Sequence, residues 1–152
     1  MAEHKSKLNL IESRPKRISA EVFSRYSAGL LKREDKLEVK STLNKSTRRL
    51  DVCFKFSTTV FNKIEGNESR LALIDIEFLG SFEWAEDAVY EDVLSFAKLN
   101  GPAIIYPLLR STLSTQSVSM GIPPIILNIV NFNKMDVAVI EEDLQYVKML
   151  IR

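Results

Sequence analysis

Prolines and glycines punctuate the apolar stretch 99–132, and their positions restrict how this part of the chain can fold. Pro102 suits the first turn of a helix, where its missing N–H costs no hydrogen bond. Pro107 lies inside the same apolar run and should bend the helix, because it removes one intrahelical hydrogen bond. Gly121 favours a helix end, and Pro123-Pro124 enforce an extended backbone. The stretch therefore predicts a bent helix followed by an extended loop.

Two segments upstream of this helix alternate apolar and polar residues with the period of a β-strand. In 50–61 and in 70–82, apolar side chains fall on one face at nearly every second position. The polar turn Glu65-Gly66-Asn67-Glu68 separates the two segments. The pattern predicts a β-hairpin.

The first third of the chain contains weaker strand patterns. Residues 37–43 alternate and predict a short strand. Residues 8–22 are ambiguous, because Pro15 favours either an edge strand or a bend. Between them, 23–36 combines Gly29 with a run of charged residues and is interpreted as a crossing loop.

The second half of the chain has helical periodicity. Helices are predicted from about 86 to 100, over 102–120, and over 134–150. The last has a narrow apolar stripe formed by Val137, Ile140, Leu144, Val147 and Ile151. Because strands precede helices without βαβ alternation, we expect an α+β fold. Its predicted architecture is an antiparallel four-stranded sheet followed by a long kinked helix and a C-terminal helix.

Length and composition indicate one globular domain, 1–152, with a sizeable core. Charged residues make up 27%, and no apolar run approaches the roughly 20 residues of a membrane helix. Residues 1–7 are polar and expected to be disordered, without the apolar core of a signal peptide. The single cysteine, Cys53, fits a reducing compartment, so a cytoplasmic location is expected.

The residue types needed for catalysis are nearly absent. His4 is the only histidine, so neither a nucleophilic triad nor a zinc site can be assembled. The five glycines form no phosphate-binding loop. Cys53 is interpreted as a half-buried structural thiol, and Asp75 with Glu77 as part of a solvated sheet face. We therefore expect no enzyme activity, no cofactor and no metal.

The net charge of +1 conceals an asymmetry along the chain. Residues 1–50 contain 13 Lys/Arg and 6 Asp/Glu, whereas residues 51–152 contain 8 and 14. A basic N-terminal third permits nucleic-acid contact. The simpler interpretation is that the two parts neutralise each other, within a protomer or across an oligomer.

The stretch 102–132 resembles the SecB family of export chaperones in the order and spacing of its motifs. The family pattern runs C-P-x-x-L-F-P-Y-x-R, then a glycine, then F-P-x-L-x-L-x-P-V-N-F. The matching residues are Pro102, Ile104, Tyr106, Pro107, Arg110, Gly121, Pro123, Leu127, Val130, Asn131 and Phe132. Asn100-Gly101 and Ile129 depart from the pattern. The resemblance extends over roughly 18–140 and implies the SecB-like fold and assembly as a dimer of dimers.

The resemblance also implies where clients and subunits would bind. In the family, a groove between the main helix, the sheet and the crossing loop takes unfolded clients. The client-binding residues predicted on this basis are Phe23, Tyr26, Leu30, Leu31, Ile125, Ile126, Leu127 and Ile129. The main helix packs at subunit interfaces in the family, which assigns Ile104, Ile105, Leu108, Leu109 and Leu113 to the oligomer interface.

An acidic residue on the fourth strand helps dock the SecA motor in SecB proteins. The matching residue here is Asp75, with Leu73 beside it on the strand. The family's partner acids on the first strand have no equivalent, because Arg14, Lys16 and Arg17 stand there. Arg110 is expected to be structural, holding a carbonyl or carboxylate near the Asn131-Phe132 turn.

Two classes of function follow from the sequence. The first is an ATP-independent holdase that binds unfolded preproteins for export or protects an antitoxin, without inserting into a membrane. The second is a nucleic-acid-binding or regulatory module that uses the basic N-terminal third. Nucleic-acid binding should fall steeply with added salt, whereas apolar client binding should survive moderate salt.

Overall fold

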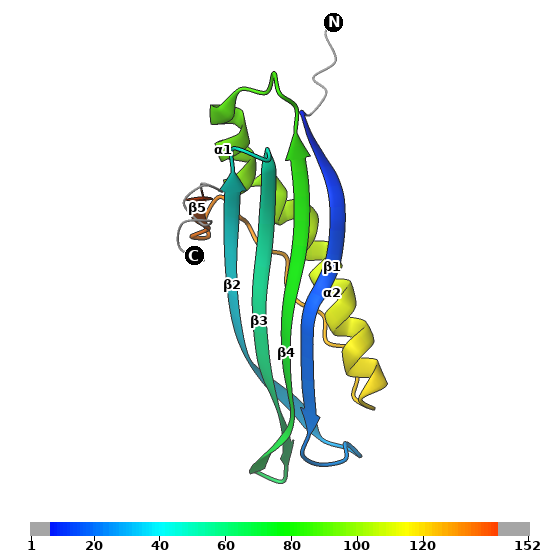
Figure 1. The fold of residues 1–152 in the computed structure, drawn as a ribbon. Helices are drawn as coiled ribbons and strands as arrows, with labels where there is room; N and C mark the ends of the chain where they lie inside the picture. The colour runs from blue at the N-terminus through cyan, green and yellow to red at the C-terminus, as the bar shows by residue number, and fades with distance from the viewer. Residues whose placement is uncertain (1–6, 143–152) are drawn as a thin grey trace, which may run out of the picture.

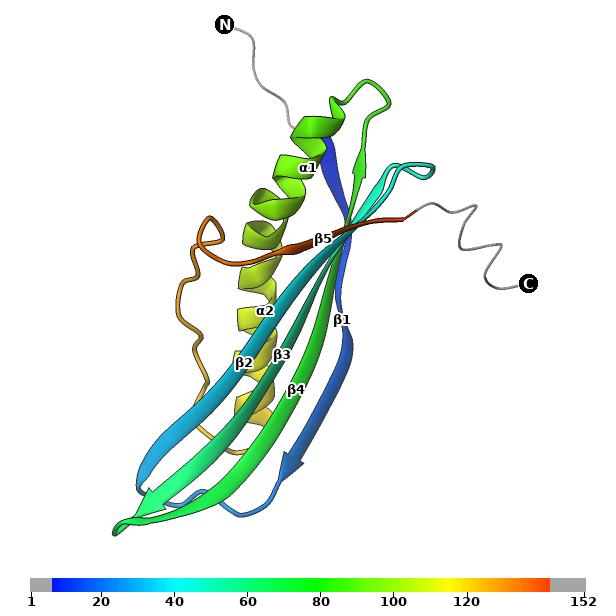
Figure 2. The same cartoon turned by 90° about the vertical axis from the view of Figure 1, so that its left-hand side faces the viewer.

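The computed structural model describes residues 7–142, which form one sheet with two helices on one of its faces (Figure 1, Figure 2). The elements are β1 (Leu8–Val22), β2 (Leu30–Asn44), β3 (Arg49–Ile64), β4 (Asn67–Trp84), α1 (Tyr90–Lys98), α2 (Asn100–Ser119) and β5 (Ala138–Glu142). The strand order is β1-β4-β3-β2-β5, antiparallel except for the parallel pair β2–β5. The predicted α+β class is confirmed.

β3 and β4 form the predicted hairpin and extend a few residues beyond the predicted ends. Its turn is made by Glu65 and Gly66, whose φ angles of 51° and 83° match the twist of the flanking strands. Phe54 lies opposite Phe78, and both side chains are buried on the helix-covered side. The hairpin thus supplies the centre of the sheet.

β1 is an edge strand, one of the two alternatives that Pro15 allowed. Its register against β4 shifts twice, between Leu10 and Glu12 and between Pro15 and Arg17. Proline is tolerated here because an edge strand has one side without a ladder. Lys7, the first described residue, forms an ion pair with Asp87 at 2.5 Å, so the predicted disorder of 1–7 does not extend to it. The rest of that prediction lies outside the described residues.

β2 begins at Leu30, earlier than the predicted strand 37–43, so the connecting loop is confined to 23–29. The charged run in its first half alternates, with Arg33 and Asp35 on the helix-covered face. Pairing with β3 along the whole strand overrides the local charge pattern that had indicated a loop.

The two helices cover one face of the sheet, close to their predicted positions. α2 continues through Pro107 and ends before Gly121, which has a positive φ of 78°. α2 approaches β4 very closely at Gly80, where a Cβ atom would overlap the side chain of Ile105. No helix among residues 7–142 is long and apolar enough to cross a membrane.

The predicted C-terminal helix over 134–150 is wrong in its first part. Ala138–Glu142 is strand β5, which pairs with Lys40–Asn44 and makes the sheet five-stranded rather than four-stranded. Val137 and Val139 pack against the core at the two-residue spacing of a strand. The open edge of β2 offers backbone hydrogen bonds, so pairing prevails over the helical stripe. Residues 143–150 of the prediction lie outside the described residues.

Candidate functional site

The loop that follows α2 runs back along the helix and is tied to it at two points. The hydroxyl of Ser117 accepts a hydrogen bond from the backbone N–H of Ile125 at 2.9 Å. The hydroxyl of Tyr106 donates to the carbonyl of Asn128 at 2.6 Å. The aromatic ring of Tyr106 packs on those of Phe54 and Phe132, 5.8 and 5.6 Å away between centroids. The loop is therefore held on the protein surface along a defined path.

The apolar side chains of this loop divide into buried anchors and exposed residues. Ile125 and Leu127 are each only 5% exposed, within the core of their own chain. Ile126 and Ile129 are 67% and 89% exposed. The prediction that Ile125 and Leu127 bind client is therefore corrected, because their side chains hold the loop down. The structure keeps Ile126 and Ile129 available to a partner.

The loop between β1 and β2 forms a second apolar region. Phe23 is partly exposed and lies under the guanidinium of Arg70, 4.5 Å from its ring centroid. Tyr26 donates a hydrogen bond to the carbonyl of Gly29 at 3.3 Å. Leu30 is 75% exposed, whereas Leu31 packs partly buried against the core. Phe23 and Leu30 thus present exposed aromatic or apolar surface, whereas Tyr26 and Leu31 are both partly buried against the core.

The structure places Phe23 and Tyr26 opposite the end of α2. A hollow of about 540 Å³ is lined by Val22, Phe23, Ser24, Arg25, Tyr26, Met120 and Gly121. The sequence prediction missed Met120 as a wall of this hollow. The sequence signal that could have identified Met120 is its flexible thioether side chain, which can adapt to partners of different shape.

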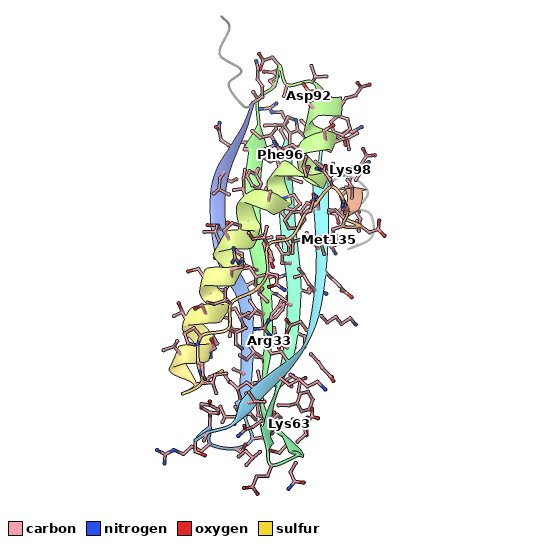
Figure 3. All side chains as sticks on the ribbon, turned by 180° about the vertical axis from the view of Figure 1, so that it is seen from behind. Arg33, Lys63, Asp92, Phe96, Lys98 and Met135 are labelled. Atoms are coloured by element: carbon pink, nitrogen blue, oxygen red, sulfur yellow. The ribbon has the colours of Figure 1, made fainter. Side chains whose placement is uncertain are left out.

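Charged and polar side chains on the helix-covered face were also missed. Asp35 accepts bonds from Arg33 Nε at 3.2 Å and from the Thr58 hydroxyl at 2.6 Å. Arg33, labelled in Figure 3, lies on β2 opposite Val60, on the face of the sheet that α2 covers. Burial raises the pKa of Tyr106, and the Asp35 carboxylate adds to this, while Arg110 and Arg33 oppose it. The charges of all three residues therefore act on the Tyr106 hydroxyl.

The predicted role of Arg110 is not supported by its contacts. Within residues 7–142 it makes no hydrogen bond and no ion pair, and its buried Nε lacks a partner. Its guanidinium carbon lies 6.0 Å from the ring centroid of Tyr106. Arg110 therefore holds no group near the Asn131-Phe132 turn.

The predicted oligomer residues of α2 fall into two groups. Ile105, Leu109 and Leu113 are fully buried against the sheet of their own chain, so their assignment to an interface is corrected. Ile104 and Leu108 lie on another side of the helix and are partly exposed. The assignment based on the family resemblance had combined residues from two sides of the helix.

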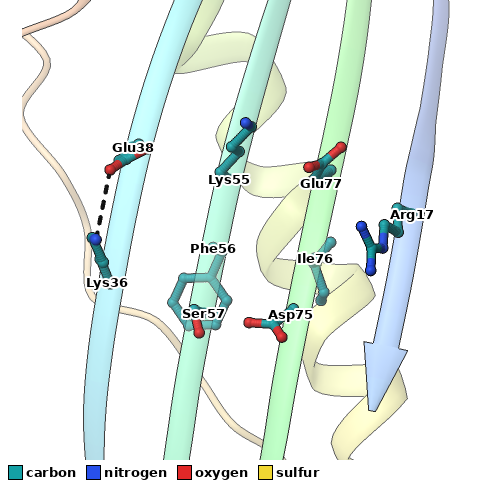
Figure 4. A pocket seen from close by; sticks show the side chains of 9 residues that line it. All are labelled: Arg17, Lys36, Glu38, Lys55, Phe56, Ser57, Asp75, Ile76 and Glu77. Carbon is teal, nitrogen blue, oxygen red and sulfur yellow. Dashed lines mark ion pairs between the residues drawn. The ribbon is translucent and has the colours of Figure 1, made fainter.

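The helix-free face of the sheet carries interleaved charges. Arg17, Glu77, Lys55 and Glu38 are neighbours across four strands, so opposite charges alternate along one row. Figure 4 shows these side chains around a hollow of about 260 Å³ with Asp75 at its lower rim. The basic residues of β1 and β2 thus face acidic neighbours, which favours neutralisation within the protomer.

Two further candidates lie on or near this face. Leu73 and Asp75, the candidates for motor docking, project from β4 on the same side as Glu77. Burial raises the pKa of the Cys53 thiol, and Glu77 adds to this while the lysines oppose it, so the thiol is not activated. The described residues contain no cluster of potential metal ligands. His4 lies outside them.

A sheet covered on one face by a long helix and an anchored extended loop is the fold of SecB-like chaperones. A Mycobacterium tuberculosis SecB-like chaperone, solved in complex with a ChAD peptide from the HigA1 antitoxin, superposes with a TM-score of 0.68. The match has 21% identity and covers 82% of this chain and 91% of that one.

The family assignment comes from the sequence. The family model described as preprotein translocase subunit SecB matches residues 2–142, and the chain belongs to the SecB family. An uncharacterized Methanocaldococcus jannaschii protein is 39% identical over 58 residues. That segment spans 38% of this chain and 37% of the relative.

Proposed function

We propose that this protein is an ATP-independent holdase that binds unfolded polypeptides through the anchored loop and the segment 23–31. The observation that carries the proposal is the exposure of Ile126 and Ile129 on a backbone fixed by Ser117 and Tyr106. Exposed apolar surface marks an interaction site when it forms a contiguous patch, and we propose that these two side chains form one with the segment 23–31.

An unfolded client supplies what this surface lacks. When its apolar side chains pack on this surface, the binding free energy gains about 25 cal/mol for each Å² of apolar surface removed from water. Several weak contacts along one client chain add through avidity, and no nucleotide is needed for this. Phe23, Tyr26 and Met120 provide an aromatic and flexible wall that adapts to different sequences.

The client is either a preprotein awaiting export or an antitoxin. The antitoxin peptide bound to the Mycobacterium tuberculosis relative favours testing antitoxins first. For export, Leu73 and Asp75 are the proposed docking site for the SecA motor. In that case Asp75→Arg would abolish SecA binding without changing client affinity. We place this activity in the cytoplasm.

We further propose that the functional unit is a homo-oligomer, a dimer of dimers. Ile104 and Leu108 of α2 are partly exposed, as are Leu10, Ile18 and Val22 of the neighbouring edge strand β1. Burying these side chains against a second copy would also protect the open edge of β1.

Native mass spectrometry with a permanently unfolded, disulfide-reduced polypeptide tests the holdase proposal. We expect a tetramer that binds one or two unfolded chains and ignores the same chain when folded. The double variant Ile126→Ser with Ile129→Ser should lose this binding, whereas the control Val89→Ser, an exposed aliphatic residue beside α1, should retain it. Failure of the wild-type protein to bind the unfolded chain would overturn the proposal.

A further inference from the structure

Arg110 is a cation without a partner inside the described fold. Its buried Nε donates no hydrogen bond to the described residues, and its guanidinium carbon lies 6.0 Å from the ring centroid of Tyr106. A buried N–H of a charged group that lacks an acceptor costs free energy, typically more than a neutral donor does. An acceptor supplied by a bound partner would remove this cost.

The position of Arg110 relates it to the anchored loop. It follows Tyr106 by four residues and precedes Ser117 by seven, so all three lie on one face of α2. Tyr106 and Ser117 hold the loop at Asn128 and Ile125, and Arg110 lies between these two ties. Its side chain is partly exposed overall, so a bound chain beside the loop can reach it.

The positive and negative charges near Arg110 do not balance. Arg33 and Asp35 form an ion pair at 3.1 Å, and Thr58 donates to the same carboxylate. Asp35 is therefore engaged already, and Arg110 adds an uncompensated positive charge near the Tyr106 hydroxyl. The chemistry of the missing partner is that of an anion with oxygen acceptors.

We infer that Arg110 is a specificity-determining residue that donates hydrogen bonds to a carboxylate of the client, an Asp or Glu side chain within an otherwise apolar extended segment. This inference rests on the proposed function. A guanidinium binds a carboxylate through two parallel hydrogen bonds, which supplies orientation as well as affinity. The apolar contacts of Ile126 and Ile129 would hold the flanking client residues.

Two synthetic peptides test this inference with the full-length protein. Both alternate leucine or phenylalanine with serine, and they differ only in a central Glu or Gln. Calorimetry or fluorescence anisotropy gives the ratio of their affinities for the wild type, Arg110→Met, Arg110→Lys and Lys98→Met. Lys98→Met is the matched control, because it removes one exposed positive charge at the end of α1.

We expect the wild type and Lys98→Met to favour the Glu peptide by about tenfold, a typical value for one charge-assisted hydrogen bond. Arg110→Met should bind both peptides equally, and Arg110→Lys should retain part of the preference, because an ammonium cannot form the paired contact. An equal affinity of the wild type for the two peptides would overturn the inference and leave the holdase proposal intact. Binding of neither peptide would overturn both.

The peptide ratio in the wild type does not depend on any variant, so a folding defect in Arg110→Met leaves the test decisive. The preference should also shrink as salt is added, since it is electrostatic. A preference of unchanged size in folded Arg110→Met would assign the carboxylate to another residue and contradict the inference.

Discussion

Strands β2 and β3 carry two different surfaces along the helix-covered face of the sheet, whereas β4 is apolar at both ends, with Ile74 and Ala72 fully buried. At the α1 end, Leu43, Leu50 and Phe82 are fully buried, and the face is apolar. At the other end, next to the loop 23–29, the face carries Arg33, Asp35, Thr58 and Asn62.

The difference follows from what covers each end. Helix α1 and the start of α2 pack side chains directly onto the first region, where a close-packed core stabilises the fold. The second region is bordered by a loop and by the hollow between Tyr26 and Met120. The core extends under both ends, but the charged and polar residues of β2 and β3 lie only at the end next to the proposed binding site. The following predictions test this division.

Phe54→Ala should produce the largest loss of stability. Its ring packs on Tyr106 and Phe132 in the fully buried core, and removing it leaves a cavity. We expect a loss of about 3–5 kcal/mol in the free energy of unfolding, measured by denaturant titration. Lys55→Ala, on the opposite face of the same strand, should change it by less than about 0.5 kcal/mol. Equal effects would contradict the packing described here.

Gly80→Ala should destabilise the contact between α2 and β4. The added methyl overlaps Ile105, which must move away, at a cost of about 1–3 kcal/mol. Combining it with Ile105→Val should recover part of the loss, because the shorter side chain makes room. Strict additivity of the two changes in thermal unfolding would show that these residues do not meet.

Ile126→Ser together with Ile129→Ser should separate binding from stability. Both side chains are exposed, so the unfolding free energy should change by less than about 0.5 kcal/mol for each. Client affinity should fall about tenfold or more, since each burial is worth about 1.5–3 kcal/mol when complete. Titration with an unfolded polypeptide measures this, and Leu127→Ser is the contrasting variant that should destabilise the fold.

Ser117→Ala should loosen the loop without disturbing the sheet. The buried N–H of Ile125 loses its acceptor, which costs about 1–2 kcal/mol. Hydrogen exchange at Ile125 should accelerate while exchange in β3 remains slow. Ser114→Ala is the control, because its hydroxyl is not part of this tie. Unaltered protection at Ile125 would exclude Ser117 as an anchor.

The smallest effect concerns Tyr90, whose hydroxyl binds Glu141 of β5 at 2.6 Å. Partial burial and the Glu141 carboxylate raise the pKa of Tyr90 to about 12. A raised pKa means that the folded state favours the neutral phenol, so its contribution is complete below pH 10 and lost as the pH approaches 12. Absorbance of the phenolate should show Tyr90 and Tyr106 titrating later than a free tyrosine, and Glu141→Gln should lower the midpoint of Tyr90 alone.

Local sequence patterns predicted a helix or strand correctly where one face of the element is consistently apolar. The hairpin of β3 and β4 and the two helices were predicted because side-chain period and backbone punctuation agree there. Leu30 and Leu31 were assigned to a loop, since the charged run that follows them hides the strand. Only the pairing of β2 with β3 reveals that Arg33 and Asp35 point inward.

The amino-acid sequence by itself determined the α+β class, the family resemblance and the positions of the exposed apolar loop. Tertiary structure decided which of its residues are anchors, since Ile125 and Ile126 are equally apolar and differ only in the side of the backbone they occupy. It also decided that Ala138–Glu142 forms β5 and not the predicted helix. The free edge of β2 with which this segment pairs cannot be recognised from the local sequence pattern. The sequence likewise could not show that Arg110 Nε lacks an acceptor, because this depends on which distant segments the fold brings next to it.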